Sequence, residues 1–123
     1  MKQFLLVFLG GGVGSLLRYL SSKYLNPIYP NFYLGTFLVN TIGCLLIGLL
    51  IGLSFKNNYL SQGQSLLLVT GFCGGFTTFS SFAFEGHSLL KDASILHFSI
   101  YTIGSLLIGI LAVSFGIWLS KML

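Results

Sequence analysis

The sequence Gly71-Phe-Cys-Gly-Gly-Phe-Thr-Thr-Phe-Ser-Ser-Phe82 lies inside the third of four apolar segments, where an ordinary membrane helix would be expected. Its paired glycines and clustered hydroxyls are poor choices for a helix that faces lipid. Unwound backbone is tolerated at membrane depth only where it is buried in protein or lines a water-filled cavity. Broken helices of this kind hold ions in transport proteins. The sequence therefore predicts an interrupted third helix with an ion site at the interruption.

The composition around this sequence is that of an integral membrane protein. Of the 123 residues, 54% are hydrophobic and 7% are charged, whereas about a quarter of the residues in an ordinary soluble domain are charged. No polar segment is large enough for an enzyme domain or a nucleic-acid-binding module. The sequence also lacks a Ser-His-Asp arrangement and a His, Cys, Asp and Glu cluster with metal-ligand spacing. We therefore expect no catalytic site and no nucleic-acid partner, but a protein embedded in a lipid bilayer.

Four apolar segments are each long enough to cross a bilayer, which takes about 20 residues in a helix. They cover about residues 4–25, 33–55, 62–91 and 95–119. Lys56-Asn57-Asn58 closes the second segment, and Asp92 or Ser94 is the expected N-cap of the fourth. The third segment is longer than one crossing requires, which fits a helix interrupted in its middle. The prediction is a single all-α membrane domain over residues 1–123, with four transmembrane helices.

Small residues recur four positions apart in these segments. The pairs are Gly10/Gly14, Gly48/Gly52, Gly71/Gly75 and Ser105/Gly109. Such spacing lets helix backbones approach closely in lipid. We therefore expect tight helix packing at these positions.

The positively charged residues give no preferred orientation in the membrane. Four crossings divide the six cations into two sets of three: Lys2, Lys56 and Lys121 on one side, and Lys23, Lys91 and Arg18 on the other. This division assumes that Arg18 reaches toward the nearer end of its helix. Equal numbers give no bias under the positive-inside rule, so the chain can insert both ways. Four short crossings enclose little space, and an antiparallel dimer is the natural way for them to build a pathway.

Polar side chains inside the segments mark candidate functional positions, because such groups are uncommon at membrane depth. Asn40 follows Thr36 by four residues, so the two lie on one helix face. The Asn40 amide carries two donors and an acceptor, and it either makes an interhelical hydrogen bond or serves an ion pathway. Tyr101 and Ser105 form a similar stripe in the fourth segment. Their hydroxyls either line a pathway or bond to carbonyls of their own helix.

In the third segment, phenylalanines alternate with hydroxyl residues. Phe76, Phe79 and Phe82 recur at every third position, which is more often a packing pattern than a functional one. The hydroxyl residues between them are Thr77, Thr78, Ser80 and Ser81. Aromatic ring edges carry partial positive charge, and hydroxyls donate hydrogen bonds. Together with Asn40 these groups form surroundings that are rich in donors and hold no fixed acid, which favours an anion over a cation.

Three motifs in this order and spacing resemble those of a known family. They are GGGVGSLLRY (Gly10–Tyr19), GTFLVNTIG (Gly35–Gly43) and Gly71–Phe82. They resemble signatures of the Fluc family of fluoride channels, also called CrcB, and the resemblance covers the whole chain. It implies an antiparallel, dual-topology homodimer with two separate fluoride pores, in agreement with the balance of cations. It also implies passive export of fluoride through the inner (plasma) membrane, which protects the cell from fluoride trapped in its cytoplasm.

The resemblance assigns roles to individual residues. It implies one central sodium ion, bound by backbone carbonyls of both subunits at positions that fall on Gly74 and Thr77. The fluoride-pore positions that it implies are Asn40, Phe79, Phe82, Ser80, Ser81, Tyr101, Ser105 and, as a weaker match, Thr36. Arg18 and Glu85 match motif positions and are expected at a vestibule, where Arg18 would concentrate anions and Glu85 would face water.

Two other functions fit parts of the sequence. A small multidrug-type, proton-coupled transporter has the same size and charge balance, but its coupling needs an acid embedded in the first segment. Here that segment holds Arg18 and no acid. A structural or assembly subunit without transport of its own would account for the packing glycines, but it leaves the donor-lined helix faces without a role.

Overall fold

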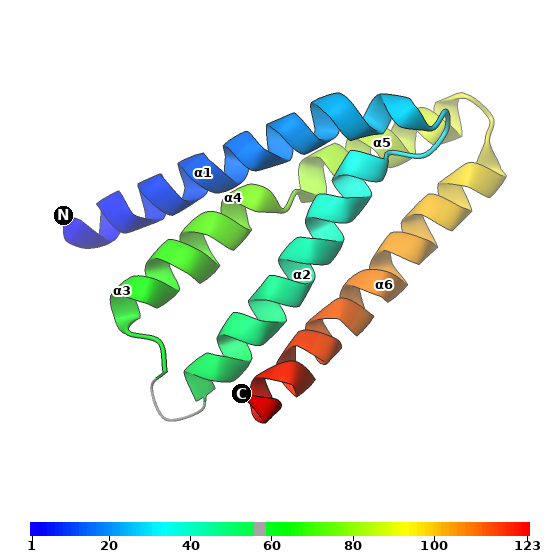
Figure 1. The fold of residues 1–123 in the computed structure, drawn as a ribbon. Helices are drawn as coiled ribbons and strands as arrows, with labels where there is room; N and C mark the ends of the chain where they lie inside the picture. The colour runs from blue at the N-terminus through cyan, green and yellow to red at the C-terminus, as the bar shows by residue number, and fades with distance from the viewer. Residues whose placement is uncertain (56–58) are drawn as a thin grey trace.

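The computed structural model describes residues 1–55 and 59–123, and the described chain is built from helices joined by short connections (Figure 1). In order these are α1 (Lys2–Leu25), η1 (Asn26–Ile28), α2 (Leu34–Phe55), α3 (Gln62–Ser65), η2 (Leu66–Cys73), α4 (Gly74–Phe76), α5 (Phe79–Lys91) and α6 (Ile95–Met122). Within the described residues, four helical runs are long and apolar enough to cross a membrane: Lys2–Ile28, Leu34–Phe55, Gln62–Lys91 and Ile95–Met122. The predicted all-α fold with four membrane-crossing helices is confirmed. The expected end of the second segment at Lys56-Asn57-Asn58 lies outside the described residues.

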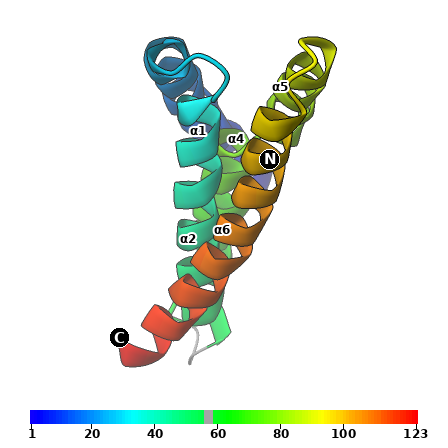
Figure 2. The same ribbon diagram turned by 90° about the vertical axis from the view of Figure 1, so that its right-hand side faces the viewer.

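The helices form two packed pairs. α2 and α6 pack against each other, and α1 packs along η2 and α4 of the third crossing. Figure 2 shows that α2 and α6 lie close at one end and splay apart at the other, where α5 lies on the α6 side and the α1–α2 connection on the other side. The third crossing thus changes partners along its length, from α1 before the interruption to α6 after it.

The third crossing is interrupted at Thr77 and Thr78, and not over the whole glycine-rich sequence. Both threonines have extended backbones, with φ −82° and ψ 158° at Thr77 and φ −150° and ψ 123° at Thr78. Residues 71–76 stay helical: η2 is a π-helix, a form often found at functional sites, and α4 follows it directly. The prediction of a break is therefore confirmed, but the expectation that its glycines would be unwound was wrong.

Gly75 is needed for close packing against α1 instead, as is Gly14 on the α1 side of the contact. A Cβ atom added to Gly14 of α1 would lie 2.3 Å from the carbonyl oxygen of Phe72, and one added to Gly75 would lie 2.4 Å from that of Gly11. Such distances leave no room for a side chain, so α1 and the third crossing touch backbone to backbone. A helix keeps its hydrogen bonds through such a contact, which is why small residues favour helix packing in membranes without unwinding.

The contact between α2 and α6 is built in the same way over part of its length. A Cβ atom at Gly48 would lie 2.3 Å from the carbonyl oxygen of Val113. The Ser105/Gly109 pair differs, because a Cβ atom at Gly109 would meet the Cys44 sulfur at 3.6 Å, which is ordinary contact. Tight packing is therefore confirmed at Gly48 but not at Gly109.

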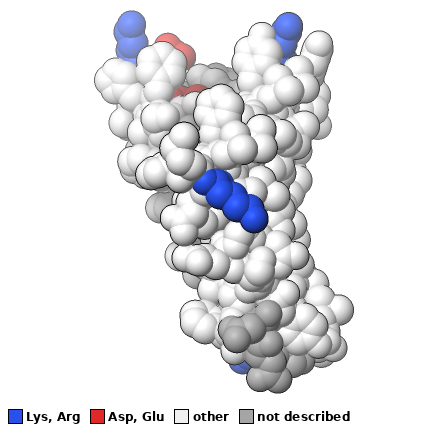
Figure 3. Space-filling view, turned by 90° about the vertical axis from the view of Figure 1, so that its left-hand side faces the viewer, with Lys and Arg blue, Asp and Glu red and all other residues white. Residues whose placement is uncertain are grey.

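The outer surface is apolar, as lipid contact requires. Many large apolar side chains are more than half exposed, among them Phe4 (79%) and Phe8 (75%) of α1. On the face shown in Figure 3, almost all of the described surface is uncharged, and acidic groups lie near one end only. The caps of the fourth crossing also differ in part from expectation: Ser94 is the N-cap of α6, whereas Asp92 is the C-cap of α5.

Replacing Gly14 with alanine tests the backbone contact between α1 and the third crossing. The added methyl group overpacks this contact, and we expect a loss of about 1–3 kcal/mol of stability, measured as a lower thermal midpoint in detergent. Gly12→Ala is the matched control, because a Cβ atom there meets no atom of the chain within 4 Å. Equal midpoints for the two variants would contradict a tight contact at Gly14.

Candidate ion site at the broken helix

A cavity of about 310 Å³ lies beside the break, between α2, α5 and α6. Its lining residues are Asn40, Gly43, Cys44, Ile47, Thr77, Thr78, Phe79, Phe82, Ser105 and Leu106. None of these side chains is acidic or basic. The cavity brings together four of the predicted pore residues, namely Asn40, Phe79, Phe82 and Ser105. A mostly apolar cavity with a few convergent polar groups is the usual form of a small-ligand site.

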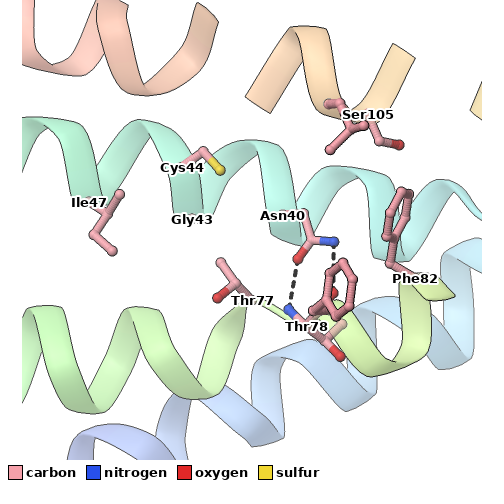
Figure 4. A pocket seen from close by; sticks show the side chains of 10 residues that line it. Asn40, Gly43, Cys44, Ile47, Thr77, Thr78, Phe82 and Ser105 are labelled. Carbon is pink, nitrogen blue, oxygen red and sulfur yellow. Dashed lines mark hydrogen bonds between the residues drawn. The ribbon is translucent and has the colours of Figure 1, made fainter. Parts of the chain in front are cut away.

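Asn40 is bonded to the break itself. Its Nδ2 donates to the carbonyl oxygen of Thr78 at 3.0 Å, and the Thr78 N–H donates to Oδ1 at 2.7 Å (Figure 4). Gly43 lies one turn further along α2, where a Cβ atom would stand 2.2 Å from Cγ2 of Thr77. Glycine therefore lets α2 come close enough for the Asn40 amide to reach Thr78. Of the two alternatives left by the sequence, the interhelical hydrogen bond is present, and Asn40 lines the cavity as well.

The three phenylalanines at every third position, Phe76, Phe79 and Phe82, have different surroundings before and after the break. Phe76 is buried and stacks on Phe72, with ring centroids 5.4 Å apart. Phe79 is 79% exposed, and its ring centroid lies 6.1 Å from that of Phe82. The Phe82 ring in turn packs on Tyr101 at 5.4 Å. The packing interpretation therefore holds for Phe76, whereas Phe79 and Phe82 line the cavity.

The Ser105 hydroxyl is buried and forms no hydrogen bond within the described chain, and the same is true of Thr102 in α6. An unpartnered buried hydroxyl costs free energy unless a ligand or water satisfies it. Since Ser105 also lines the cavity, its hydroxyl is available to donate to a bound anion. Of the two interpretations of this stripe, bonding to its own helix does not apply to Ser105.

Glu85 of α5 is the centre of a buried polar cluster. Its carboxylate accepts from the Thr36 hydroxyl at 2.6 Å, the Tyr101 hydroxyl at 2.6 Å and Asn26 Nδ2 at 3.2 Å. Glu85 is 7% exposed, and Thr36 and Tyr101 are fully buried. This differs from the water-facing side chain expected at Glu85. Three donors can hold a carboxylate at membrane depth without a basic partner.

Asn26 was not among the residues selected from the sequence. It begins η1, and its Oδ1 accepts from the Thr36 N–H at 3.2 Å while its Nδ2 reaches Glu85. Asn26 thus joins the α1–α2 connection to both α2 and α5. Its position next to Pro27 is typical of a helix end, and nothing in the local pattern distinguishes a bridging asparagine from a capping one.

Ser80 and Ser81 lie apart from the first cavity. Together with Tyr33, Phe84 and Glu85 they line a second cavity of about 380 Å³. Different faces of the first turn of α5 therefore adjoin two different spaces, with Phe79 and Phe82 at one and the serines at the other. The sequence grouped all four residues along one polar path, whereas the chain divides them between two cavities.

Arg18 reaches the break instead of the nearer end of its helix. Its Nε donates to the carbonyl oxygen of Gly75 at 3.0 Å, and the Ser15 hydroxyl lies 3.4 Å from the same oxygen. The guanidinium is thereby placed at the carboxyl end of the helical run before the break, where the helix dipole favours a positive charge. The assumption that Arg18 extends toward the nearer helix end was wrong.

Gly74 and Thr77, the two residues matched to sodium ligands, have carbonyls that lose their helical donors. In an uninterrupted helix each carbonyl oxygen accepts from the N–H four residues later, here Thr78 for Gly74 and Ser81 for Thr77. The Thr78 N–H donates to Asn40, and the Ser81 N–H donates to Thr78 Oγ1 at 3.2 Å. Gly74 is also exposed, with open space beside its Cα atom. Because carbonyls freed at helix breaks are suitable ligands for sodium, these residues fit the ion.

The fold and this site define a multi-pass membrane protein with a discontinuous helix, the class in which ion sites lie at the helix break. The family model of "CrcB-like protein, Camphor Resistance (CrcB)" matches residues 5–117, and the chain belongs to this family. The resemblance drawn from the three motifs is confirmed.

Named relatives match over almost their full length. The chain is 52% identical over 122 residues to the "Fluoride-specific ion channel FluC" of Gloeothece citriformis, with 98% of each chain covered. It is 48% identical over 124 residues to the protein of the same name from Chlorobium phaeobacteroides, covering 98% of this chain and 96% of the relative. The protein of that name from Phocaeicola vulgatus is 47% identical over 125 residues, with 98% and 100% covered.

Replacing Thr36 with valine tests the buried cluster, because valine keeps the shape of threonine and removes the hydroxyl that donates to Glu85. Leaving a buried acceptor short of a donor costs about 1–3 kcal/mol, so we expect a lower thermal midpoint. Thr41→Val is the control in the same helix, since the Thr41 hydroxyl forms no hydrogen bond in the described part of the chain. A Thr36→Val midpoint equal to that of the control would show that the Thr36 hydroxyl adds nothing to stability.

Proposed function

We propose that this chain is a fluoride-selective ion channel that lets fluoride leave the cell passively, down its electrochemical gradient. The observation that carries the proposal is the uncharged cavity at the break, where Asn40, Ser105, Phe79 and Phe82 meet. Its amide, hydroxyl and ring edges supply partial positive charge without a fixed acid. The names of relatives at 52% and 48% identity support fluoride as the ion. A channel changes no covalent bond, so we propose no enzymatic activity.

The cavity residues would act by replacing the water around fluoride. Fluoride is small and tightly hydrated, so a narrow pathway must offer strong donors in place of its water shell. The unpartnered Ser105 hydroxyl is one such donor, and the Phe79 and Phe82 ring edges would bridge the apolar part of the path. Chloride would be rejected because a larger ion needs a wider path and a different arrangement of donors.

The proposed assembly is an antiparallel homodimer of dual topology, with two fluoride pores and one structural sodium ion between the subunits. The sodium would be held by the carbonyl oxygens of Gly74 and Thr77 of both copies and would fix the two broken helices to each other. Arg18 is directed to the break and no longer counts for either side of the membrane. The order of the crossings places three of the other five cations, all lysines, on one side of the membrane and two on the other. This near balance supports insertion in both orientations. We place the channel in the inner (plasma) membrane, where it would relieve fluoride toxicity.

Ion flux from liposomes tests the channel. Purified protein should release fluoride rapidly when an ionophore sets the membrane potential, and it should leave chloride inside. Protein-free liposomes provide the background. Chloride release at a comparable rate would refute fluoride selectivity. Fluoride release that requires an accompanying proton flux would favour the proton-coupled transporter instead.

Substituting Phe79 or Phe82 with leucine tests the ring edges. Leucine keeps an apolar side chain but removes the positive edge of the ring, so we expect the fluoride flux to fall at least about tenfold, equivalent to about 1.4 kcal/mol in the barrier. Phe8→Leu is the control, because Phe8 of α1 is exposed and does not line the cavity. Wild-type flux in both cavity variants, with protein of equal folded yield, would remove the rings from the pathway.

A further inference from the structure

The neighbouring carbonyl groups of Gly74 and Gly75 both lose their helical hydrogen bonds at the break, but within the described residues only that of Gly75 gains new donors. The Gly75 carbonyl oxygen accepts from Arg18 and Ser15 of α1. Gly74 loses its donor because the Thr78 N–H donates to Asn40 Oδ1 at 2.7 Å. Side chains of α1 therefore donate to the Gly75 carbonyl, whereas Asn40 of α2 takes the N–H group that would otherwise donate to the Gly74 carbonyl.

The Asn40 amide is largely used by the backbone. Its oxygen accepts the Thr78 N–H, and one of its two N–H groups donates to the Thr78 carbonyl oxygen at 3.0 Å. Only one N–H is left to face the cavity. An asparagine paired with both polar groups of a single residue fixes that part of the backbone firmly, because two hydrogen bonds set its position and its orientation.

The surrounding packing is built for this contact. Gly43 allows α2 to approach Thr77. The carbonyl oxygen of Cys73 accepts both the N–H of Thr77 at 3.0 Å and its hydroxyl at 2.9 Å, which closes the first half of the helix. Thr78 then caps the second half by accepting the Ser81 N–H. The backbone on each side of the break is thus held by the hydroxyl of Thr77 or Thr78. The Thr78 N–H is the group that needs an acceptor from another helix.

We propose that Asn40 is the positioning residue of the break: by holding Thr78 it keeps the Gly74 carbonyl free for a hard cation and sets the start of α5, which carries Phe79 and Phe82. This inference rests on the proposed function for the identity of the cation, sodium. It assigns to Asn40 a structural action on the cation site in addition to its place in the lining of the anion cavity.

An isosteric series at Asn40 tests the inference. Asn40→Leu keeps the shape and removes both hydrogen bonds, whereas Asn40→Asp keeps an oxygen that accepts the Thr78 N–H. The readout is the thermal midpoint of the purified protein in sodium chloride against choline chloride, followed as a sodium titration. For Asn40→Leu we expect the half-saturating sodium concentration to rise at least about tenfold, since losing one partner of a buried hydrogen bond costs about as much as a tenfold change in affinity. Asn40→Asp should keep the sodium response.

Ser105→Ala is the matched control, because Ser105 lines the same cavity but makes no hydrogen bond to the break. It should lower fluoride flux and leave the sodium titration unchanged, whereas Asn40→Leu should alter both. If Asn40→Leu gives no folded protein, Asn40→Ser takes its place, since one short hydroxyl cannot hold both groups of Thr78.

The outcomes separate the two proposals. A wild-type sodium titration in Asn40→Leu or Asn40→Ser would overturn the positioning role and leave the channel proposal intact. Loss of the response in Asn40→Asp as well would show that accepting the Thr78 N–H is not what frees Gly74. If the thermal midpoint of the wild-type protein does not change with sodium concentration, the cation site and this inference are both overturned. Fluoride flux in wild-type liposomes tests the channel separately.

Discussion

Backbone groups at membrane depth cannot turn to water, so every hydrogen bond lost at a helix break must be replaced from within the protein. The break at Thr77 and Thr78 meets this constraint with side chains from two other helices. Asn40 of α2 holds the Thr78 peptide group, and Arg18 of α1 donates to Gly75. Both side chains must lie within hydrogen-bond distance of the same two turns. The placement of α1 and α2 around the third crossing follows from that requirement.

Glycine makes this arrangement possible by removing side chains where backbones must meet. Gly14 and Gly75 bring α1 against the third crossing, and Gly43 brings α2 against Thr77. A methyl group at any of the three would overlap a neighbouring atom, and the helices would have to separate. Asn40 has a short side chain that could not follow such a shift. The hydrogen bonds of the polar residues at the site therefore depend on the packing glycines.

The sequence predicts the four crossings because runs of about 20 apolar residues are typical of helices that span a bilayer, and it places the break within a dozen residues. It does not locate the break at Thr77 and Thr78, since whether a glycine unwinds or packs depends on what lies opposite. Contacts such as Arg18 to Gly75 and Asn26 to Glu85 join residues more than 50 positions apart. Periodicity along one segment carries no information on such pairs, and a short polar residue near a proline looks like any other helix end.

The buried acid and the uncharged cavity both adjoin the short helix α5, and Tyr101 connects them. Its ring packs on Phe82 at the cavity, and its hydroxyl donates to Glu85 in the polar cluster. A carboxylate facing an anion across about 4 Å would repel it by about 4 kcal/mol at an effective dielectric constant of 20. The three donors to Glu85 hold its oxygens in the cluster, and the aromatic side chains of Tyr101 and Phe82 line the way between them. The helix that we propose presents ring edges to an anion can therefore carry an acid three residues after Phe82.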